Sequence, residues 1–138
     1  MERGELSEVV QAFVEATGEI CAQLLDAKVQ QVAMRASENS LTRFDGAVAI
    51  VGFSGGLSGR LFLGVSASFL SALSLSMSGD ESSSLEEQLL AMNEFGNLIA
   101  GHALTRVNNR FPEANVRPAP PSSFWGEQLV FFNFGMGG

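Results

Sequence analysis

The sequence has very few of the residues that crosslink a chain or bind metal ions. It contains one cysteine, Cys21, and one histidine, His102, in 138 residues. A single cysteine cannot form an internal disulfide, and one histidine cannot build a histidine-rich metal site. These counts predict a protein of a reducing compartment without a structural zinc.

Positive charge is scarce as well. Eight lysine and arginine residues stand against fifteen aspartate and glutamate residues, so the net charge is -7 and the pI is near 4.6. Such a chain repels phosphate backbones and anionic lipids, and we expect no nucleic-acid partner. No apolar run approaches the roughly 18 residues of a membrane helix, and residues 1–8 lack the features of a secretory signal. We therefore expect a cytoplasmic protein without membrane insertion.

Apolar residues, by contrast, are plentiful. They make up 46% of the chain against 17% for charged residues, which excludes a disordered acidic tail. A chain of this length can bury a core of its own without a disulfide or a metal. Residues 1–138 are therefore expected to form a single domain.

The first segment has the apolar spacing of a helix, with Ser7 as its expected N-cap. The buried stripe of this helix is expected to contain Val10, Phe13, Thr17, Ile20, Cys21 and Leu24. On this stripe the cysteine is a small core residue rather than a nucleophile. A weaker strand is expected over residues 29–36, followed by a polar turn.

Residues 47–53 and 60–65 are rich in β-branched and aromatic residues, and a glycine-rich run separates them. The pattern predicts an antiparallel hairpin. A phosphate-binding loop is the alternative, but the run lacks the Gly-Lys-Ser/Thr ending. A short apolar helix is expected over residues 67–77. Residues 122–138 leave room for two short strands, so that a second chain or further residues would complete the sheet.

The longest periodic segment covers residues 85–111, where Pro112 ends the helix. At about 100° per residue, its apolar positions form one core-facing stripe. The stripe comprises Leu85, Leu89, Met92, Phe95, Ile99, Ala103 and Val107. Two acidic residues, Glu86 and Glu87, fall in the first turn, where the helix dipole explains them without any function.

The opposite side of this helix carries Glu94 and Asn97 one turn apart, with Gly101 beside them and with Leu90 and Asn108 on the same line. A carboxylate can pair with a lysine or arginine of a partner, and a carboxamide can hold a water molecule and aim it. Neither group is a nucleophile or a good acid–base catalyst at neutral pH, so any chemistry would consist of positioning a water molecule. Spacing alone favours an ordinary solvated surface for such residues.

The run over residues 93–101, Asn-Glu-Phe-Gly-Asn-Leu-Ile-Ala-Gly, resembles the signature of the CheC/CheX/FliY chemotaxis phosphatases, above all CheX. That signature is Glu, two residues, Asn, an apolar pair and Ala-Gly. Pro120 can fill the place of the family's downstream proline, and the hairpin followed by a short helix is also similar to CheX. The resemblance covers residues 13–126. It implies an α+β fold in which the N-terminal helix and the long site-bearing helix pack on an antiparallel sheet.

The same resemblance implies a phosphatase that dephosphorylates the phospho-aspartate of a CheY-like response regulator. Glu94 would pair with the regulator's active-site lysine, and Asn97 would enter its active site and orient the attacking water. Mg²⁺ would be held by the regulator, so this chain would have no cofactor of its own. Leu90, where family members often have Asp or Ser, and Gly101 would flank the pair as partner contacts. A homodimer formed by pairing of sheet edges is also expected.

Two other functions stay open. One is a non-catalytic module that docks a receiver or a flagellar-switch partner through the same helix. The other is a small-ligand sensor with a pocket under the hairpin. Among weaker candidate sites, His102 is expected to be half-buried at the boundary of the apolar stripe. Phe124 and Trp125 could form an exposed recognition patch, but packing in the core or in a dimer contact is favoured.

Overall fold

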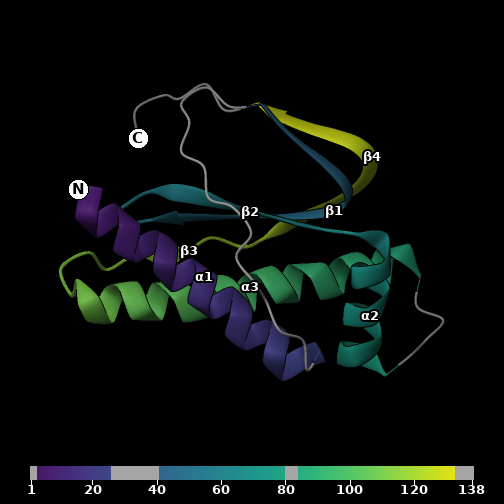
Figure 1. Cartoon of the computed structure of the whole chain (residues 1–138), viewed down its shortest axis with the longest axis horizontal. Coiled ribbons are helices and arrows are strands. Elements are labelled where there is room, and N and C mark those ends of the chain that lie inside the picture. The colour runs from purple at the N-terminus through teal and green to yellow at the C-terminus, as the bar shows by residue number, and fades with distance from the viewer. Residues whose placement is uncertain (1–2, 26–40, 80–83, 133–138) are drawn as a thin grey trace.

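The computed structural model describes three stretches of the chain, residues 3–25, 41–79 and 84–132. Their helices and strands are, in chain order, α1 (Arg3–Leu25), β1 (Leu41–Ser54), β2 (Gly59–Val65), α2 (Ala67–Ser78), α3 (Leu85–Arg110), β3 (Arg117–Pro118) and β4 (Ser122–Phe132). Figure 1 shows two layers, with α1 and α3 side by side along one face of the sheet and α2 at one end. The expected α+β architecture is confirmed.

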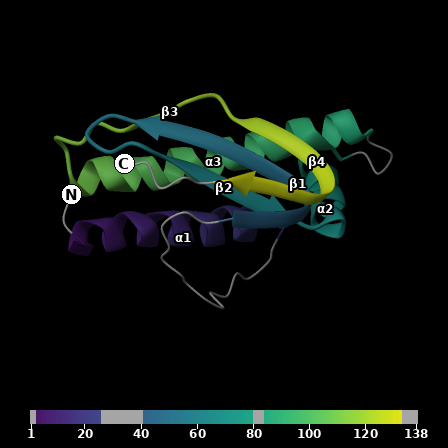
Figure 2. The same cartoon turned by 90° about the horizontal axis from the view of Figure 1, so that it is seen from above.

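Strand β1 is the centre of the sheet. It pairs antiparallel with β2 on one side and with β4 and β3 on the other, so that Ala47 lies between Val65 of β2 and Trp125 of β4. Seen from above, both long helices lie beneath the strands (Figure 2). The strand expected over residues 29–36 lies outside the described residues.

The β1–β2 hairpin is confirmed, and its glycine-rich run is a turn that contacts the rest of the molecule. Gly55 has a φ of 148°, and a Cβ atom there would lie 2.5 Å from the backbone oxygen of Asn115. The neighbouring Gly56 N–H donates to the oxygen of Ala114 at 2.6 Å. The two glycines therefore let the hairpin turn pack directly on the segment that follows α3.

Helix α3 begins and ends as expected. The Ser84 hydroxyl accepts a hydrogen bond from the Glu87 N–H at 3.2 Å, which is the geometry of an N-cap. At the other end, the Phe111 N–H donates to the Val107 oxygen at 2.8 Å and Pro112 follows. The predicted stripe is buried or half-buried from the second turn onward. Leu85 is the exception: it is 44% exposed, because it is the first residue of the helix and lies beyond the core cluster.

Helix α1 differs from the expectation at both its start and its buried face. It includes residues from Arg3 onward, so Ser7 is an exposed residue inside the helix and not its N-cap. The buried positions are Val9, Ala12, Ala16, Ile20 and Cys21, so two residues of the expected stripe are buried and its other four are half-buried. Small alanines let α1 and α3 pack closely, and a search for large apolar residues misses them. Cys21 does belong to the core, and burial raises the pKa of its thiol.

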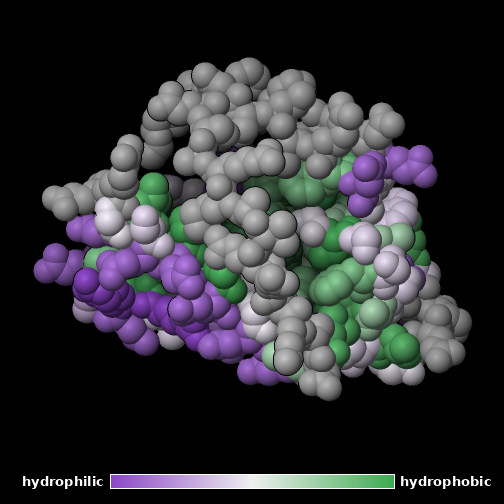
Figure 3. All heavy atoms as spheres, viewed as in Figure 1, coloured by the Kyte–Doolittle hydropathy of each residue, from purple (hydrophilic) through white to green (hydrophobic). Residues whose placement is uncertain are grey.

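Polar contacts between α1 and α3 gather at one end of the helix pair. Arg106 pairs with Glu15 at 2.7 Å and also with Glu19, and Arg110 pairs with Glu8 at 3.2 Å. Figure 3 shows the hydrophilic side chains that accumulate over this end of the molecule. Within the described residues, no helix combines the length and the hydropathy needed to cross a bilayer.

Strand β4 is one continuous element instead of the two short strands expected after Pro121. It runs from Ser122 to Phe132, and a register irregularity opposite Phe44 and Gly46 lets it continue through Gly126. The Gly-Glu-Gln sequence there resembles a turn, which is why the sequence favours two short strands over one long one. Residues 133–138 lie outside the described part.

Candidate functional site

Glu94 and Asn97 lie one turn apart on the outer side of α3, and both are exposed. No hydrogen bond or ion pair joins either side chain to another residue of the described stretches. The carboxylate and the carboxamide are therefore both open to groups that approach from outside. The structure thus brings together the two residues that the sequence singled out.

The residues predicted to flank the pair are placed differently from one another. Leu90 is 62% exposed, one turn before Glu94. Gly101 is half-buried, yet a Cβ atom added to it would meet nothing within 4 Å. The backbone at Gly101 is therefore open to close approach by another molecule. Both residues lie on the same surface as the pair.

Asn108 does not extend this exposed line, although its helical angle predicted that it would. Its side-chain nitrogen donates to the Val116 oxygen at 2.9 Å, and its side-chain oxygen accepts from the Val116 N–H at 2.8 Å. The amide therefore satisfies both backbone groups of a buried residue. Asn108 anchors the segment after α3 and contributes nothing to the exposed face.

A residue that the sequence analysis passed over sets the position of the pair. Gly96 is buried between Glu94 and Asn97, and a Cβ atom there would lie 3.3 Å from both the Ala49 Cβ and the Val51 Cγ2. The missing side chain lets α3 lie close to β1. A glycine inside a helix costs about 1 kcal/mol relative to alanine, so its presence between two candidate residues indicates a packing reason.

Strand β4 is hydrogen-bonded to α3 at Asn93, the residue before Glu94. The Ser123 hydroxyl donates to the side-chain oxygen of Asn93. Trp125 and Phe124 on this strand are 40% and 46% exposed, so they do not pack in the core, while the dimer contact and the exposed patch stay predictions. The reason is that β4 is an edge strand whose side chains only partly overlap the helix layer. His102 is also exposed rather than half-buried.

The charged side chains of the first half of α3 are all of one sign. Glu86, Glu87 and Glu94 are exposed, and the sequence from residue 85 to 101 contains no lysine or arginine. The arginines of the second half of α3 pair with glutamates of α1 instead. The first half of the helix therefore presents a negative surface that favours a cationic group on a partner. Among the described residues, no three His, Cys, Asp or Glu side chains gather as metal ligands.

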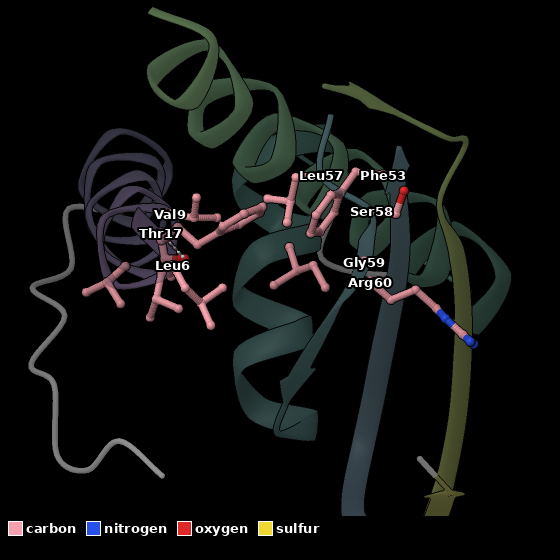
Figure 4. Close-up of a pocket in the computed structure, with 12 residues that line it drawn as sticks. Leu6, Val9, Thr17, Phe53, Leu57, Ser58, Gly59 and Arg60 are labelled. Atoms are coloured by element: carbon pink, nitrogen blue, oxygen red, sulfur yellow. Dashed lines mark hydrogen bonds between the residues drawn. The ribbon is translucent and has the colours of Figure 1, made fainter. Parts of the chain in front are cut away.

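A second candidate site lies between α1 and the β1–β2 turn. It is an open groove of about 480 Å³, lined mainly by apolar side chains that include Leu6, Val10, Phe13, Leu57 and Leu61. Figure 4 shows the lining residues on both sides of the groove, with Leu6 and Val9 on the helix and Phe53 and Leu57 on the hairpin, while the guanidinium of Arg60 points away from the groove. The lining includes no residue of α3, so this groove is separate from Glu94 and Asn97.

Comparison with known proteins identifies the family. A family model described as "Chemotaxis phosphatase CheX" matches residues 47–130, a segment that contains most of the hairpin, α2, α3 and most of β4. Glu94 and Asn97 fall inside this match. No curated protein matches the chain.

Solved structures share the fold at low sequence identity. A chemotaxis protein CheX from Desulfovibrio desulfuricans superposes with a TM-score of 0.80 and 20% identity, over 91% of this chain and 82% of that chain. CheX from Vibrio vulnificus superposes with a TM-score of 0.76 and 17% identity, over 90% of this chain and 82% of that chain. A chain of the CheX–CheY–BeF3–Mg complex from Borrelia burgdorferi superposes with a TM-score of 0.61 and 19% identity, over 86% of this chain and 77% of that chain. The family model spans more than half of this chain, and the chain therefore belongs to the CheX family of chemotaxis phosphatases.

Proposed function

We propose that this protein dephosphorylates the phospho-aspartate of a CheY-like receiver domain, with Glu94 and Asn97 as the working pair. The observation that carries the proposal is their placement, one turn apart and exposed on α3, within the segment matched by the CheX family model. The Borrelia burgdorferi relative, which was solved in complex with CheY, supports a receiver as the partner.

Glu94 supplies the docking charge in this proposal. Its carboxylate pairs with the lysine of the receiver's active site, and removing this pair from water makes it directional and strong. The negative surface formed with Glu86 and Glu87 steers the receiver toward α3 before contact. Pairing at Glu94 fixes α3 over the phosphorylated pocket and brings Asn97 to the phosphoryl group.

Asn97 positions the nucleophile. Its carboxamide both donates and accepts hydrogen bonds, so it can hold one water molecule in line with the scissile bond. The water oxygen forms a new bond to phosphorus while the bond between phosphorus and the receiver's aspartate oxygen breaks. The bonding electrons return to the aspartate, which leaves as a carboxylate, and both protons of the water leave on inorganic phosphate as H2PO4⁻. Orientation of this kind removes a large share of the entropic barrier.

The remaining charge is neutralised by the receiver. Mg²⁺ bound in the receiver stabilises the charge on the transferring phosphoryl oxygens, so this chain supplies no metal. Leu90 and Gly101 contact the receiver on either side of the pair, and the open space at Gly101 admits a backbone segment. The proposal places the protein in the cytoplasm with its receiver.

Release of inorganic phosphate from a phosphorylated CheY-like receiver tests the function. The wild-type protein is expected to accelerate release, and Asn97→Ala to remove at least about a hundredfold of that acceleration. Glu94→Ala is expected to raise KM about tenfold or more, because docking loses its charge pair. Asn109→Ala and Glu113→Ala change exposed residues of the same types elsewhere, and they should behave like the wild type. Equal rates in all five proteins would reject the assignment.

The same assay separates the non-catalytic alternative. A protein that binds the receiver through α3 without faster phosphate release would be a docking module. The expected homodimer, formed by pairing of sheet edges, is a further part of the proposal. Light scattering of the full-length protein checks it, since two copies double the mass.

The groove between α1 and the hairpin favours a second candidate function, the binding of a small apolar ligand. Its volume of about 480 Å³ is in the range of ligand-binding sites, and its lining is largely apolar. A melting shift caused by an apolar ligand, retained in Asn97→Ala but lost when Val10→Trp fills the groove, would establish this function. Absence of any such shift across a panel of apolar ligands would exclude it.

A further inference from the structure

The surface around Glu94 and Asn97 includes a large aromatic side chain that the chemistry described above does not use. Trp125 is the only tryptophan of the chain, and it lies exposed on β4. Tryptophan buries more apolar area than most residues and is enriched at the energetic centres of protein interfaces. Its exposure beside a docking site therefore needs a reason.

The strand register fixes which way Trp125 points. Successive residues of a strand face opposite sides of the sheet, so Trp125 shares a face with Ser123. Since the Ser123 hydroxyl bonds to Asn93, this face is the one directed at α3. Phe124 lies between them in sequence and faces the other side of the sheet.

The direction of β1 fixes where along α3 Trp125 lies. Phe53, near the end of β1, packs in a cluster with Leu104 and Val107 of the second half of α3. The middle of β1 contacts α3 at Gly96, and Ala47, opposite Trp125, comes earlier in the strand. Trp125 therefore lies over the first turns of α3, the part that carries Leu90.

Asn93 is the centre of this arrangement. Leu90 precedes it by three residues and Asn97 follows it by four, and both spacings bring side chains together on one helix surface. Trp125 and Leu90 thus lie on one side of Asn93, and Asn97 and Glu94 lie toward the other. This placement puts the two apolar side chains at the border of the proposed catalytic pair.

The charges around this surface indicate the chemistry of its partner. Glu86 and Glu87 lie one turn before Leu90, and no lysine or arginine occurs in this half of the helix. An apolar centre with an acidic border is complementary to a surface that carries an apolar patch beside cations. A receiver domain that presents an active-site lysine to Glu94 supplies the cation that this partner surface requires.

We infer that Trp125 and Leu90 form the apolar half of the receiver-docking surface and that the Ser123–Asn93 hydrogen bond holds Trp125 in place. This inference rests on the proposed function, because its partner is the same CheY-like receiver. Trp125 acts in recognition and not in catalysis. It contributes to affinity for the receiver and leaves the water held by Asn97 untouched.

Fluorescence offers a direct test, because Trp125 is the only tryptophan. A CheY-like receiver whose own tryptophans are replaced by phenylalanine is loaded with BeF3⁻ and Mg²⁺ and titrated into the full-length protein. Burial of Trp125 in the complex should shift its emission to shorter wavelength in proportion to the receiver bound. Binding, measured independently by calorimetry, without any change in emission would overturn the inference.

Kinetics with matched variants supply the second test. Trp125→Ala and Leu90→Ala should each raise KM for the phosphorylated receiver about tenfold, with kcat within about twofold of the wild type. Phe124→Ala removes a comparably exposed aromatic side chain from the other face of the same strand and should leave KM unchanged. Trp125→Phe should fall between the wild type and Trp125→Ala.

The outcomes separate this inference from the proposed function. A wild-type protein that binds the receiver with an emission shift but does not speed dephosphorylation rejects the phosphatase and retains the docking surface. Loss of activity in Asn97→Ala with an unchanged KM in Trp125→Ala and Leu90→Ala retains the phosphatase and rejects the docking surface. A change of oligomeric state in Trp125→Ala would assign this residue to a contact between copies and overturn the inference.

Discussion

Gly96 of α3 lies so close to Ala49 of β1 that a Cβ atom on the glycine would be 3.3 Å from the Cβ of Ala49. The helix therefore rests on the sheet at the point midway between Glu94 and Asn97. The distance between backbone layers here determines how far the pair projects from the molecule. Packing inside the core and geometry at the exposed surface are coupled through this one contact.

Gly96→Ala should destabilise the protein and also lower its activity. The added methyl group would lie 3.3 Å from Ala49 and Val51, so these neighbours must give way by a few tenths of an ångström. Overpacking of this kind costs about 1–3 kcal/mol, against a gain in helix propensity of about 1 kcal/mol. We expect a net loss of about 1 kcal/mol in the free energy of unfolding. Denaturant titration measures this loss, and the phosphate-release assay measures the accompanying decrease in rate. A variant more stable than the wild type would show that the sheet adapts freely.

Gly101→Ala is the matched substitution in the same helix, with the opposite expectation for stability. A Cβ at this position meets nothing within 4 Å, so the methyl group causes no clash inside the molecule. Removing a helical glycine should raise the free energy of unfolding by about 0.5–1 kcal/mol. The methyl group nevertheless occupies the space that we assign to the receiver's backbone, so KM should rise. A more stable variant with unchanged KM would show that no partner approaches Gly101.

Asn108→Ala should reduce stability without changing kcat. The substitution removes both hydrogen bonds to the backbone of Val116, a buried residue, and we expect a loss of about 2 kcal/mol. Asn109→Ala removes an exposed asparagine from the adjacent position and should change stability by less than about 0.5 kcal/mol. Thermal denaturation of both variants measures the two changes in stability. Equal melting temperatures would contradict the anchoring role of Asn108.

The parts of the fold that local spacing determines were predictable. The orientation of Glu94 and Asn97 follows from the rotation per residue of α3, and the cap at Ser84 follows from a serine before an acidic first turn. The hairpin follows from two apolar segments around glycines. None of these features depends on which distant segment comes to lie nearby.

The parts that depend on distant partners were not predictable. Asn108 has the helical angle of an exposed residue, and only the return of the chain at Val116 gives its amide a buried partner. The buried face of α1 is formed by small residues such as Ala12 and Ala16, whose role depends on the closeness of α3. Trp125 has the composition of a core residue, and only the position of β4 at the edge of the sheet leaves it exposed.

Cys21 should make stability decrease at alkaline pH. Burial raises the pKa of its thiol above the ordinary value of 9.0, so the folded state holds this proton more tightly than the unfolded state. The stability that this tighter proton binding contributes is fully present below the pKa of the thiol in the unfolded state. It is lost as pH rises from there toward the pKa of the thiol in the folded state. Denaturant titrations of the wild type and of Cys21→Ala across this range measure it. The difference in unfolding free energy between the two proteins should shrink as pH rises, and a constant difference would contradict the prediction.

Glu94→Gln should change how salt affects docking. The carboxylate attracts the receiver over distances comparable to the Debye length, about 10 Å at 0.1 M salt, so added salt weakens association of the wild type. The amide keeps the shape and loses the charge, so both the association rate at low salt and its dependence on salt should fall. Stopped-flow measurement of association with a BeF3⁻-loaded receiver at several salt concentrations gives both values. Glu113→Gln removes the same charge from the turn after α3 and should retain the wild-type association rate. If the two variants have the same salt dependence, only overall charge acts and Glu94 has no specific partner.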